Sequence, residues 1–396
     1  VESSHPWLSE KCAEALKAKL AASGTDSFSV KRDECSRVFR EAYDEFVVKT
    51  KSKLASLSAD SKQWWRLSNW LSMKSVPCVS IPALRDENGA WATSSADKAD
   101  LLQRSFRNRS TLPCLAPNEF TPVALHDRSE HLRIEFGAEQ VEAELKRLQT
   151  DSAVGPDLVS PRLLRACARE IAPAVAMLCG IIVSQGKWPS LWRKHWMVPI
   201  HKKKSRADPC NYRGVHLTSQ LGKVCERVIA GTFLPSLEVA VGDSQYAYSK
   251  GKGHRAALLT NLLRWKSDLE LGAVIGLYCS DVSGAFDKVC SDILACNIAN
   301  LQLPTNVEKL LGSWLEPRTA SVLVGGHTSA EATLSDSVYQ GTMWGPPLWN
   351  LHFASSINAV AEAGFASVVY ADDLNASKAF SAISIDADID MDLQLC

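Results

Sequence analysis

The tetrapeptide Tyr370-Ala371-Asp372-Asp373 places tight limits on the fold around it. It follows the apolar run 366–369, and Leu374-Asn375-Ala376 leads into more apolar sequence. This pattern predicts a strand, a tight turn that carries the aspartates, and a second strand. A hairpin tip can hold two oxygen ligands in a rigid arrangement, which suits Mg²⁺. Because an Asp-Asp turn on its own is typical of solvated surface, the assignment needs a second acidic position.

That second position is Asp281. It follows residues 273–279, a near-continuous apolar run that predicts a buried strand. A carboxylate at the end of such a strand is costly unless it meets a cation. Two-metal phosphoryl transfer needs carboxylates from separate strands around ions roughly 3.5–4 Å apart. We therefore predict that Asp281, Asp372 and Asp373 are catalytic and bind two Mg²⁺ ions, with Mn²⁺ as an alternative. We interpret Asp287 as the cap of the following helix.

With these residues in place, the chain resembles the reverse transcriptases of non-LTR (LINE-type) retrotransposons. The resemblance covers about residues 135 to 380, with a looser likeness before that. Seven segments come in the family's order: Ala153-Val154-Gly155-Pro156-Asp157, Trp192 to Lys204, Asn211 to Thr218, Gln245 to Gly251, Asp281 to Asp287, Gln340 to Pro346, and Tyr370 to Asp373.

The resemblance implies an α/β (α+β) right-hand polymerase, with fingers and palm in residues 135–396. A helical N-terminal region and an irregular linker would occupy residues 1–134. The family continues after the Tyr370–Asp373 box with a helical thumb. Residues 383–392 instead alternate strictly between apolar and polar positions, so we expect that the thumb is missing and that the chain is truncated. Whether an endonuclease domain precedes it in the full element stays open.

The resemblance also implies a dNTP site. Phe286 would lie under the incoming sugar, where a bulky ring excludes a ribose 2′-hydroxyl. Lysine offers a point charge to a triphosphate, whereas arginine offers a planar fork. Glycine allows a ligand to approach the backbone closely. The full set of implied dNTP-binding residues is Lys202, Lys203, Arg213, Phe286, Gln340 and Gly341. Two positions depart from the family pattern: Gly214 stands in place of proline, and Trp344 in place of a small or aliphatic residue.

The formal net charge is zero, with 44 basic and 44 acidic residues. Basic residues nevertheless gather between Lys187 and Arg227, and a local patch matters more than net charge for phosphate binding. A solvated surface loop is the alternative reading of the triple lysine at 202–204. The twelve cysteines show no zinc-ligand spacing. We expect free thiols in a reducing intracellular compartment, the nucleus and cytoplasm.

The longest apolar stretch, Ile171 to Val183, is interrupted by Pro173 and is too short to span a bilayer, so no membrane is expected.

Residues up to about 75 should be helical, and their Trp64-Trp65 pair should pack in the core, with stacking on nucleic acid as the alternative. Residues 76–135 look irregular, with a turn at 86–89.

Helices are expected from Gly137, from Ser160-Pro161 and over Pro347–Ala363. Short strands should flank the basic loop at 198–200 and 214–217, and a hairpin should turn at Gly325-Gly326.

The predicted function is RNA-directed DNA synthesis, in which a primer 3′-hydroxyl attacks a dNTP. The expected partners are an RNA template, a DNA primer and dNTPs. One alternative is an RNA-dependent RNA polymerase, against which Phe286 and the Ala371-containing box argue. The other is a catalytically silent retroelement fragment that only binds nucleic acid.

Overall fold

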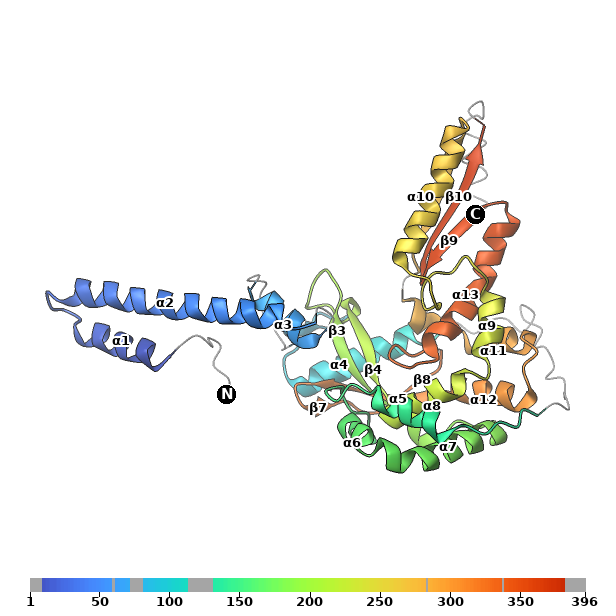
Figure 1. Ribbon diagram of the computed structural model, residues 1–396, viewed down its shortest axis with the longest axis horizontal. Coiled ribbons are helices and arrows are strands. Elements are labelled where there is room, and N and C mark those ends of the chain that lie inside the picture. Colours follow the sequence, from blue (N-terminus) through green and yellow to red (C-terminus); the bar gives the residue numbers. More distant parts are fainter. Residues whose placement is uncertain are drawn as a thin grey trace. The chain divides into compact units, whose positions relative to one another are not determined.

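The computed structural model describes residues 9–58, 61–71, 81–112, 131–282, 284–336 and 338–381 (Figure 1). By its internal contacts the chain divides into two compact units, Val1–Ser80 and Ile81–Cys396. The sequence analysis set the start of the polymerase at residue 135, whereas the contacts assign residues 81–134 to the second unit. The alternating segment 383–392 lies outside the described residues.

The first unit is helical, as predicted. Its helices are α1 (Glu10–Ala21), α2 (Phe28–Ala55) and α3 (Lys62–Leu71), and α2 packs against both of the others. Trp64 and Trp65 form an edge-to-face pair with ring centroids 5.0 Å apart. Trp65 is 56% exposed, so the expectation that both tryptophans pack in a core is wrong for Trp65.

The expectation that residues 76–135 are irregular is wrong for 84–109. Strands β1 (Leu84–Arg85) and β2 (Trp91–Ala92) form a small hairpin around the predicted turn. Helix α4 (Ser95–Arg109) follows, and the Ser94 side chain caps it by accepting a hydrogen bond from the Asp97 N–H. Its buried face packs against β6, which explains why the second unit begins at residue 81; the buried residues are Ala99, Leu101, Leu102 and Phe106.

A five-stranded sheet joins distant parts of the second unit. Its strands are β3 (Lys194–His201), β4 (Tyr212–Leu217), β6 (Arg318–Val324), β7 (His327–Thr328) and β8 (Ala332–Leu334). Strands β3 and β4 contain the two segments that were predicted as strands around the basic loop. They pair with each other in antiparallel fashion. Strand β3 also pairs in parallel with β6. The predicted hairpin turns at Gly325 and Gly326, which both have positive φ.

Helices cover this sheet and build most of the core. The helices predicted from Gly137 and from Ser160-Pro161 are present as α5 and α6, which begin one residue later. In chain order, the helices of this layer are α5 (Ala138–Lys146), α6 (Pro161–Ala166), α7 (Ala168–Gln185), α8 (Gln220–Ala230), α9 (Leu234–Val241), α11 (Ser291–Asn300) and α12 (Thr305–Leu315).

The apolar stretch around Pro173 was predicted to be interrupted by that proline. Helix α7 instead continues through Pro173 and is 18 residues long. By length and composition it is the one helix among the described residues that could cross a membrane. Here seven of its residues are buried, and they belong to the core that also contains β3 and α8. The predicted absence of a membrane stays a prediction.

A second, three-stranded sheet carries the acidic segments. Its strands are β5 (Val274–Ser280), β9 (Ala366–Tyr370) and β10 (Asp373–Phe380), in the order β5-β10-β9 with antiparallel pairing throughout. Helix α10 (His254–Glu270) lies alongside this sheet (Figure 1) and contacts β5 and β9. Helix α13 (Gly345–Glu362), predicted from 347 to 363, also contacts β9. The chain is therefore a mixed helix and sheet protein, as predicted.

Candidate active site

The predicted aspartate hairpin is present. Asp373 pairs with Tyr370, so Ala371 and Asp372 alone form the turn between β9 and β10. Leu374 pairs with Ser280 on β5, and the same register carried one residue further sets Asp373 opposite Asp281. Opposite residues of an antiparallel pair project to the same face. The register thus brings the two acidic segments together.

A backbone strain marks this turn. Ala371 has φ 61°, in the left-handed region that favours glycine. Such a conformation persists only where the surroundings hold it. The buried Gln245 side chain does so, because its Oε1 accepts a hydrogen bond from the Ala371 N–H (3.0 Å) and its Nε2 donates to the Ala371 carbonyl (3.1 Å). The indole N–H of Trp349 donates to the same carbonyl at 3.2 Å.

The face that carries Asp281 and Asp373 is open. A cleft of about 520 Å³ lies between this face of the sheet and α10, and it is lined by Asp281, Asp373 and Tyr370. Both aspartates are exposed, whereas Asp372 is half-buried at the turn. On the opposite face Val369, Leu374 and Ala376 join the hydrophobic core, which anchors the sheet.

The three aspartates interact electrostatically. The pKa of Asp372 is raised, first by burial and then by the negative charges of Asp281 and Asp373. A cation would relieve this repulsion, and carboxylate oxygens are the donors that Mg²⁺ prefers. Within the described ranges, however, no three ligating side chains converge on one point. Among these residues the three carboxylates therefore lie near one another without forming a closed metal site.

A cationic cluster lies nearby. The half-buried Asp287 has a pKa raised by burial, and the positive charges of Arg109, Lys202, Arg213 and Lys288 oppose that shift. The interpretation of Asp287 as a helix cap is wrong, because it lies in the short 3-10 helix Ala285–Lys288 and the next helix begins at Ser291. Its carboxylate instead offsets repulsion between cations.

Arg213 connects the two groups. It acts electrostatically on Asp287 and on Lys202, and it also lowers the pKa of Asp372. Of the predicted triphosphate ligands, Arg213 therefore lies within electrostatic reach of Asp372, and Lys202 lies within reach of Arg213. Lys203 is exposed and is not among the charges that shift the pKa of Asp287 or Lys202.

Phe286 stands at the end of an aromatic stack. Its ring lies on the indole of Trp349 (centroids 5.8 Å apart, 20° between planes), which in turn lies on Phe353 at 5.3 Å. Tyr248 meets Phe286 edge-to-face at 6.2 Å and has the positive φ of 59°. Burial and then the charge of Asp372 raise the pKa of Tyr248, so the phenol also lies near the aspartate turn.

The Gln340-Gly341 segment is attached to β4. The His216 N–H donates to the Gln340 carbonyl at 2.9 Å. Gly341 has φ 115°, and a Cβ atom there would lie 2.5 Å from the His216 carbonyl oxygen. Only glycine therefore fits this close approach.

A buried polar network lies beneath this attachment. Arg318 Nη1 contacts His195 Nε2 at 2.9 Å, and His195 Nδ1 contacts His216 Nδ1 at 3.0 Å. Arginine can only donate, so His195 accepts at Nε2 and donates from Nδ1. Burial and the charge of Arg318 lower the pKa of His195 and bring that of His216 to about 3.

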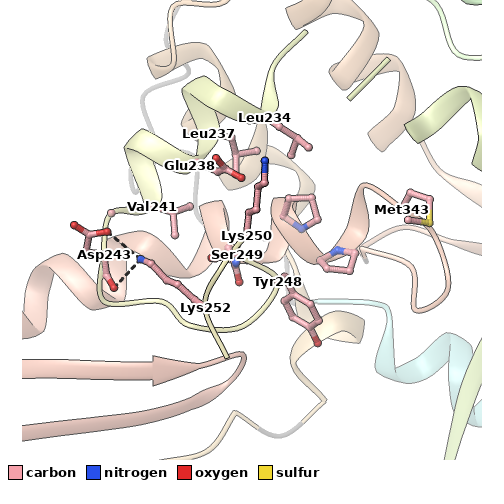
Figure 2. Close-up of a pocket in the computed structure, with 14 residues that line it drawn as sticks. Leu234, Leu237, Glu238, Val241, Asp243, Tyr248, Ser249, Lys250, Lys252 and Met343 are labelled. Carbon is pink, nitrogen blue, oxygen red and sulfur yellow. Dashed lines mark hydrogen bonds and ion pairs between the residues drawn. The ribbon is translucent and has the colours of Figure 1, made fainter. Parts of the chain in front are cut away.

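A second cleft, of about 420 Å³, borders Tyr248 (Figure 2). It lies between α9, the loop 242–252 and the first turn of α13. Lys252 points toward Asp243 and pairs with it at 3.0 Å. Lys250 also lines this cleft.

The two departures from the family pattern have packing reasons. A Cβ atom at Gly214 would lie 2.3 Å from the Met197 methyl and 3.2 Å from the Phe106 ring, so a larger residue would have to displace the Met197 side chain. Trp344 is fully buried, and its indole N–H donates to the Glu226 carbonyl at 2.7 Å.

The sequence analysis did not single out Gln245, Trp349, Tyr248 or Arg109 as site residues. Gln245 and Tyr248 lie in one of the seven segments that resemble the family, so the sequence did point to their neighbourhood. Arg109 lies outside all seven segments, so no sequence pattern indicated it.

Comparison with known proteins agrees with this geometry. Residues 200–380 match the family described as reverse transcriptase (RNA-dependent DNA polymerase). Residues 200–380 are thus similar to a reverse transcriptase domain. The chain is 26% identical over 347 residues to the RNA-directed DNA polymerase from mobile element jockey of Drosophila melanogaster, covering 81% of this chain and 36% of the relative. The corresponding protein of Drosophila funebris is 25% identical over 323 residues, covering 78% and 35%.

A third relative comes from another insect. The Retrovirus-related Pol polyprotein from type-1 retrotransposable element R1 of Bradysia coprophila is 27% identical over 270 residues, covering 65% of this chain and 26% of the relative. The predicted resemblance to non-LTR reverse transcriptases is confirmed. The chain spans about a third of the length of the jockey polymerases that it matches.

Proposed function

We propose that this chain is the polymerase part of a non-LTR retrotransposon protein and adds dNTPs to a primer 3′-hydroxyl on an RNA template. One observation carries the proposal. The register of β5, β10 and β9 sets Asp281 beside Asp372 and Asp373, and Arg213 lies within electrostatic reach of Asp372. Acidic ligands and a phosphate-binding cation thus meet within a reverse transcriptase domain.

Each residue group has a separate task in this proposal. Asp281, Asp372 and Asp373 would hold two Mg²⁺ ions, which supply Lewis-acid stabilisation of the charge that develops during phosphoryl transfer. Arg213 and Lys202 bind and orient the triphosphate, and Lys203 contributes charge at its outer end. Asp287 keeps these cations from repelling one another when no substrate is bound.

The remaining groups shape the nucleotide site. The stack beneath Phe286 fixes its ring, so that the ring excludes a ribose 2′-hydroxyl. Gln340 and Gly341 would line the nucleotide site, at a segment that Gly341 allows to lie close to the His216 carbonyl. The nine cysteines within the described ranges are all free, which supports a reducing compartment, the nucleus or cytoplasm, as the place of action.

Primer extension tests the proposal. The purified chain is given an RNA template, a labelled DNA primer and Mg²⁺, with either dNTPs or rNTPs. We expect extension with dNTPs, little with rNTPs, and none in Asp281→Asn. Extension that prefers rNTPs would indicate the RNA polymerase alternative. Nucleic-acid binding without any extension would indicate the silent fragment.

A further inference from the structure

The Ala371 turn is held by side chains from two other segments of the chain. Gln245 bonds to the N–H and to the carbonyl of Ala371, and the indole N–H of Trp349 donates to the same carbonyl. All three bonds end on one residue, whose backbone is in the strained left-handed region. The turn between β9 and β10 therefore depends on residues 126 and 22 positions away in the sequence.

The Gln245 side chain acts here as a short piece of strand. Its amide group offers both a donor and an acceptor, so it pairs with the two backbone groups of Ala371 as a neighbouring peptide would. An ionised glutamate could only accept, and an asparagine would be one methylene too short. Gln245 is fully buried, where an unmet donor or acceptor is costly, so the fold strongly favours this pairing.

The backbone around Gln245 is itself fixed. The Tyr246 N–H donates to the Val369 carbonyl at 2.8 Å, which bonds this loop to the edge of β9, the strand that leads into the turn. Asn350 on α13 adds a second tie, because its Nδ2 donates to the Ala247 carbonyl at 2.9 Å. Gln245 therefore has the rigid support that a positioning residue requires.

Trp349 belongs to two groups at once. Its N–H holds the Ala371 carbonyl at 3.2 Å, and its ring lies beneath the Phe286 ring at a centroid distance of 5.8 Å. Trp349 is 2% exposed and also packs on Phe353, so its ring has little space in which to shift. One side chain thus joins the aspartate turn to the residue that is proposed to exclude ribose.

From these contacts we infer that Gln245 and Trp349 are positioning residues for nucleotide addition. Both act through the Ala371 turn on the aspartates that follow it, and Trp349 also sets the place of the Phe286 ring. The inference rests on the proposed function. It assigns the geometry of the aspartates to the hydrogen bonds and sugar selection to the Trp349 ring, so the two effects can be separated.

Steady-state primer extension measures the effect of Gln245. Gln245→Asn keeps the amide group but cannot span the gap to Ala371. The kcat for dNTPs should fall about 10- to 100-fold, the scale of a small misplacement of reacting groups. The KM for dNTPs should be unchanged, since neither Arg213 nor Lys202 is altered. The ratio of rNTP to dNTP use should also be unchanged.

Two substitutions divide the roles of Trp349. Trp349→Phe loses the N–H and keeps an aromatic ring, so kcat should fall about 2- to 10-fold, the scale of one hydrogen bond, at an unchanged rNTP-to-dNTP ratio. Trp349→Leu also loses the ring beneath Phe286, so the ratio should rise about ten-fold, the low end for one pocket contact. An equal ratio in both variants would overturn the role assigned to the ring.

Trp314→Phe on α12 is the matched control, because this buried tryptophan also donates an indole N–H bond, here to Glu226 at 2.8 Å. The variants are compared at equal folded fraction, measured by urea titration, and Trp314→Phe should keep its kcat. Losses of kcat in Gln245→Asn and Trp349→Phe no larger than in Trp314→Phe would overturn the inference, since both residues would then only pack in the core.

Hydrogen exchange at the Ala371 amide tests the inference without activity. In the full chain with isotope-labelled alanine, NMR should show this amide exchanging about 2- to 10-fold faster in Gln245→Asn, because one protecting bond is lost. The rate in Trp314→Phe should be unchanged. An unchanged rate in Gln245→Asn would show that the glutamine does not hold the turn. A chain that never extends primers would refute the proposed function, and these exchange rates would then decide the inference alone.

Discussion

At the scale of single residues, the ionised carboxylate of Asp372 lowers the stability of the fold. Its pKa is raised by burial and by two neighbouring carboxylates. A folded-state pKa above the unfolded value means that stability is greatest below the unfolded pKa and is lost as the pH rises through the folded one. At neutral pH the ionised Asp372 therefore weakens the metal-free fold, as functional groups often do.

Asp372→Asn removes this ionisation. We expect a higher melting temperature in EDTA at neutral pH, together with a loss of extension of about 100-fold or more, the scale of one electrostatic contact to a transition state. Mg²⁺ should raise the melting temperature of the unaltered chain and not that of the variant. Asp44→Asn, an exposed control, should change neither property. A lower melting temperature in Asp372→Asn would show that the carboxylate stabilises the turn.

Phe286 is the residue at which sugar selection can be measured. Phe286→Val removes the ring from its stack on Trp349. We expect rNTP use relative to dNTP use to rise about ten-fold or more, the scale of one pocket contact, while dNTP use is largely kept. The measurement is single-nucleotide incorporation with each substrate. Phe286→Tyr retains the ring and should keep the original ratio. An unchanged ratio in Phe286→Val would mean that the ring is only a packing residue.

At the scale of elements, the histidine pair between β3 and β4 couples the sheet to pH. Both histidines stay neutral in the fold, with the His216 pKa near 3, whereas an unfolded histidine titrates near 6.5. The contribution of His216 to stability is present above about pH 6.5 and is lost as the pH falls toward 3. It amounts to about 1.4 kcal/mol per pH unit inside that window.

His216→Gln should therefore flatten the fall in unfolding free energy between pH 6 and pH 4, by about 1.4 kcal/mol per unit. Urea titrations at several pH values measure this slope. The variant also loses ring packing, so its absolute stability at pH 7 should drop. His327→Gln on the exposed β7 should leave the slope unchanged. An equal slope in both variants would mean that His216 is protonated in the fold.

The elements nearest the aspartates were the most predictable. Local patterns were enough for β9 and β10, because apolar runs flank the Tyr370–Asp373 turn, and for α5, because Val141 and Leu145 recur at helical spacing. Helix α4 was missed because four of its first six residues are polar or charged, and only its packing on β6 reveals its apolar face. Asp287 was misread because its cationic partners come from residues 109, 202 and 213, which no local pattern connects.

At the scale of the whole molecule, the division after Ser80 defines two separable parts. Compact units with their own cores can unfold independently. We expect that a chain lacking residues 1–80 keeps the melting transition of the larger unit. Calorimetry of the full chain should show a second, smaller transition that the deletion removes. Failure of residues 81–396 to fold would show that the helical unit supports the larger one.

The parallel pairing of β3 with β6 has a consequence for synthesis on the ribosome. Lys194 emerges early, yet its partner Thr319 is translated only after β4, β5 and the five helices α8 to α12. At about 5–20 residues per second, β3 waits on the order of ten seconds with one edge unpaired. An open edge can recruit other chains. Nascent molecules should therefore depend on chaperones most strongly during that interval, and a pause in translation between the two strands should lower the yield of native protein.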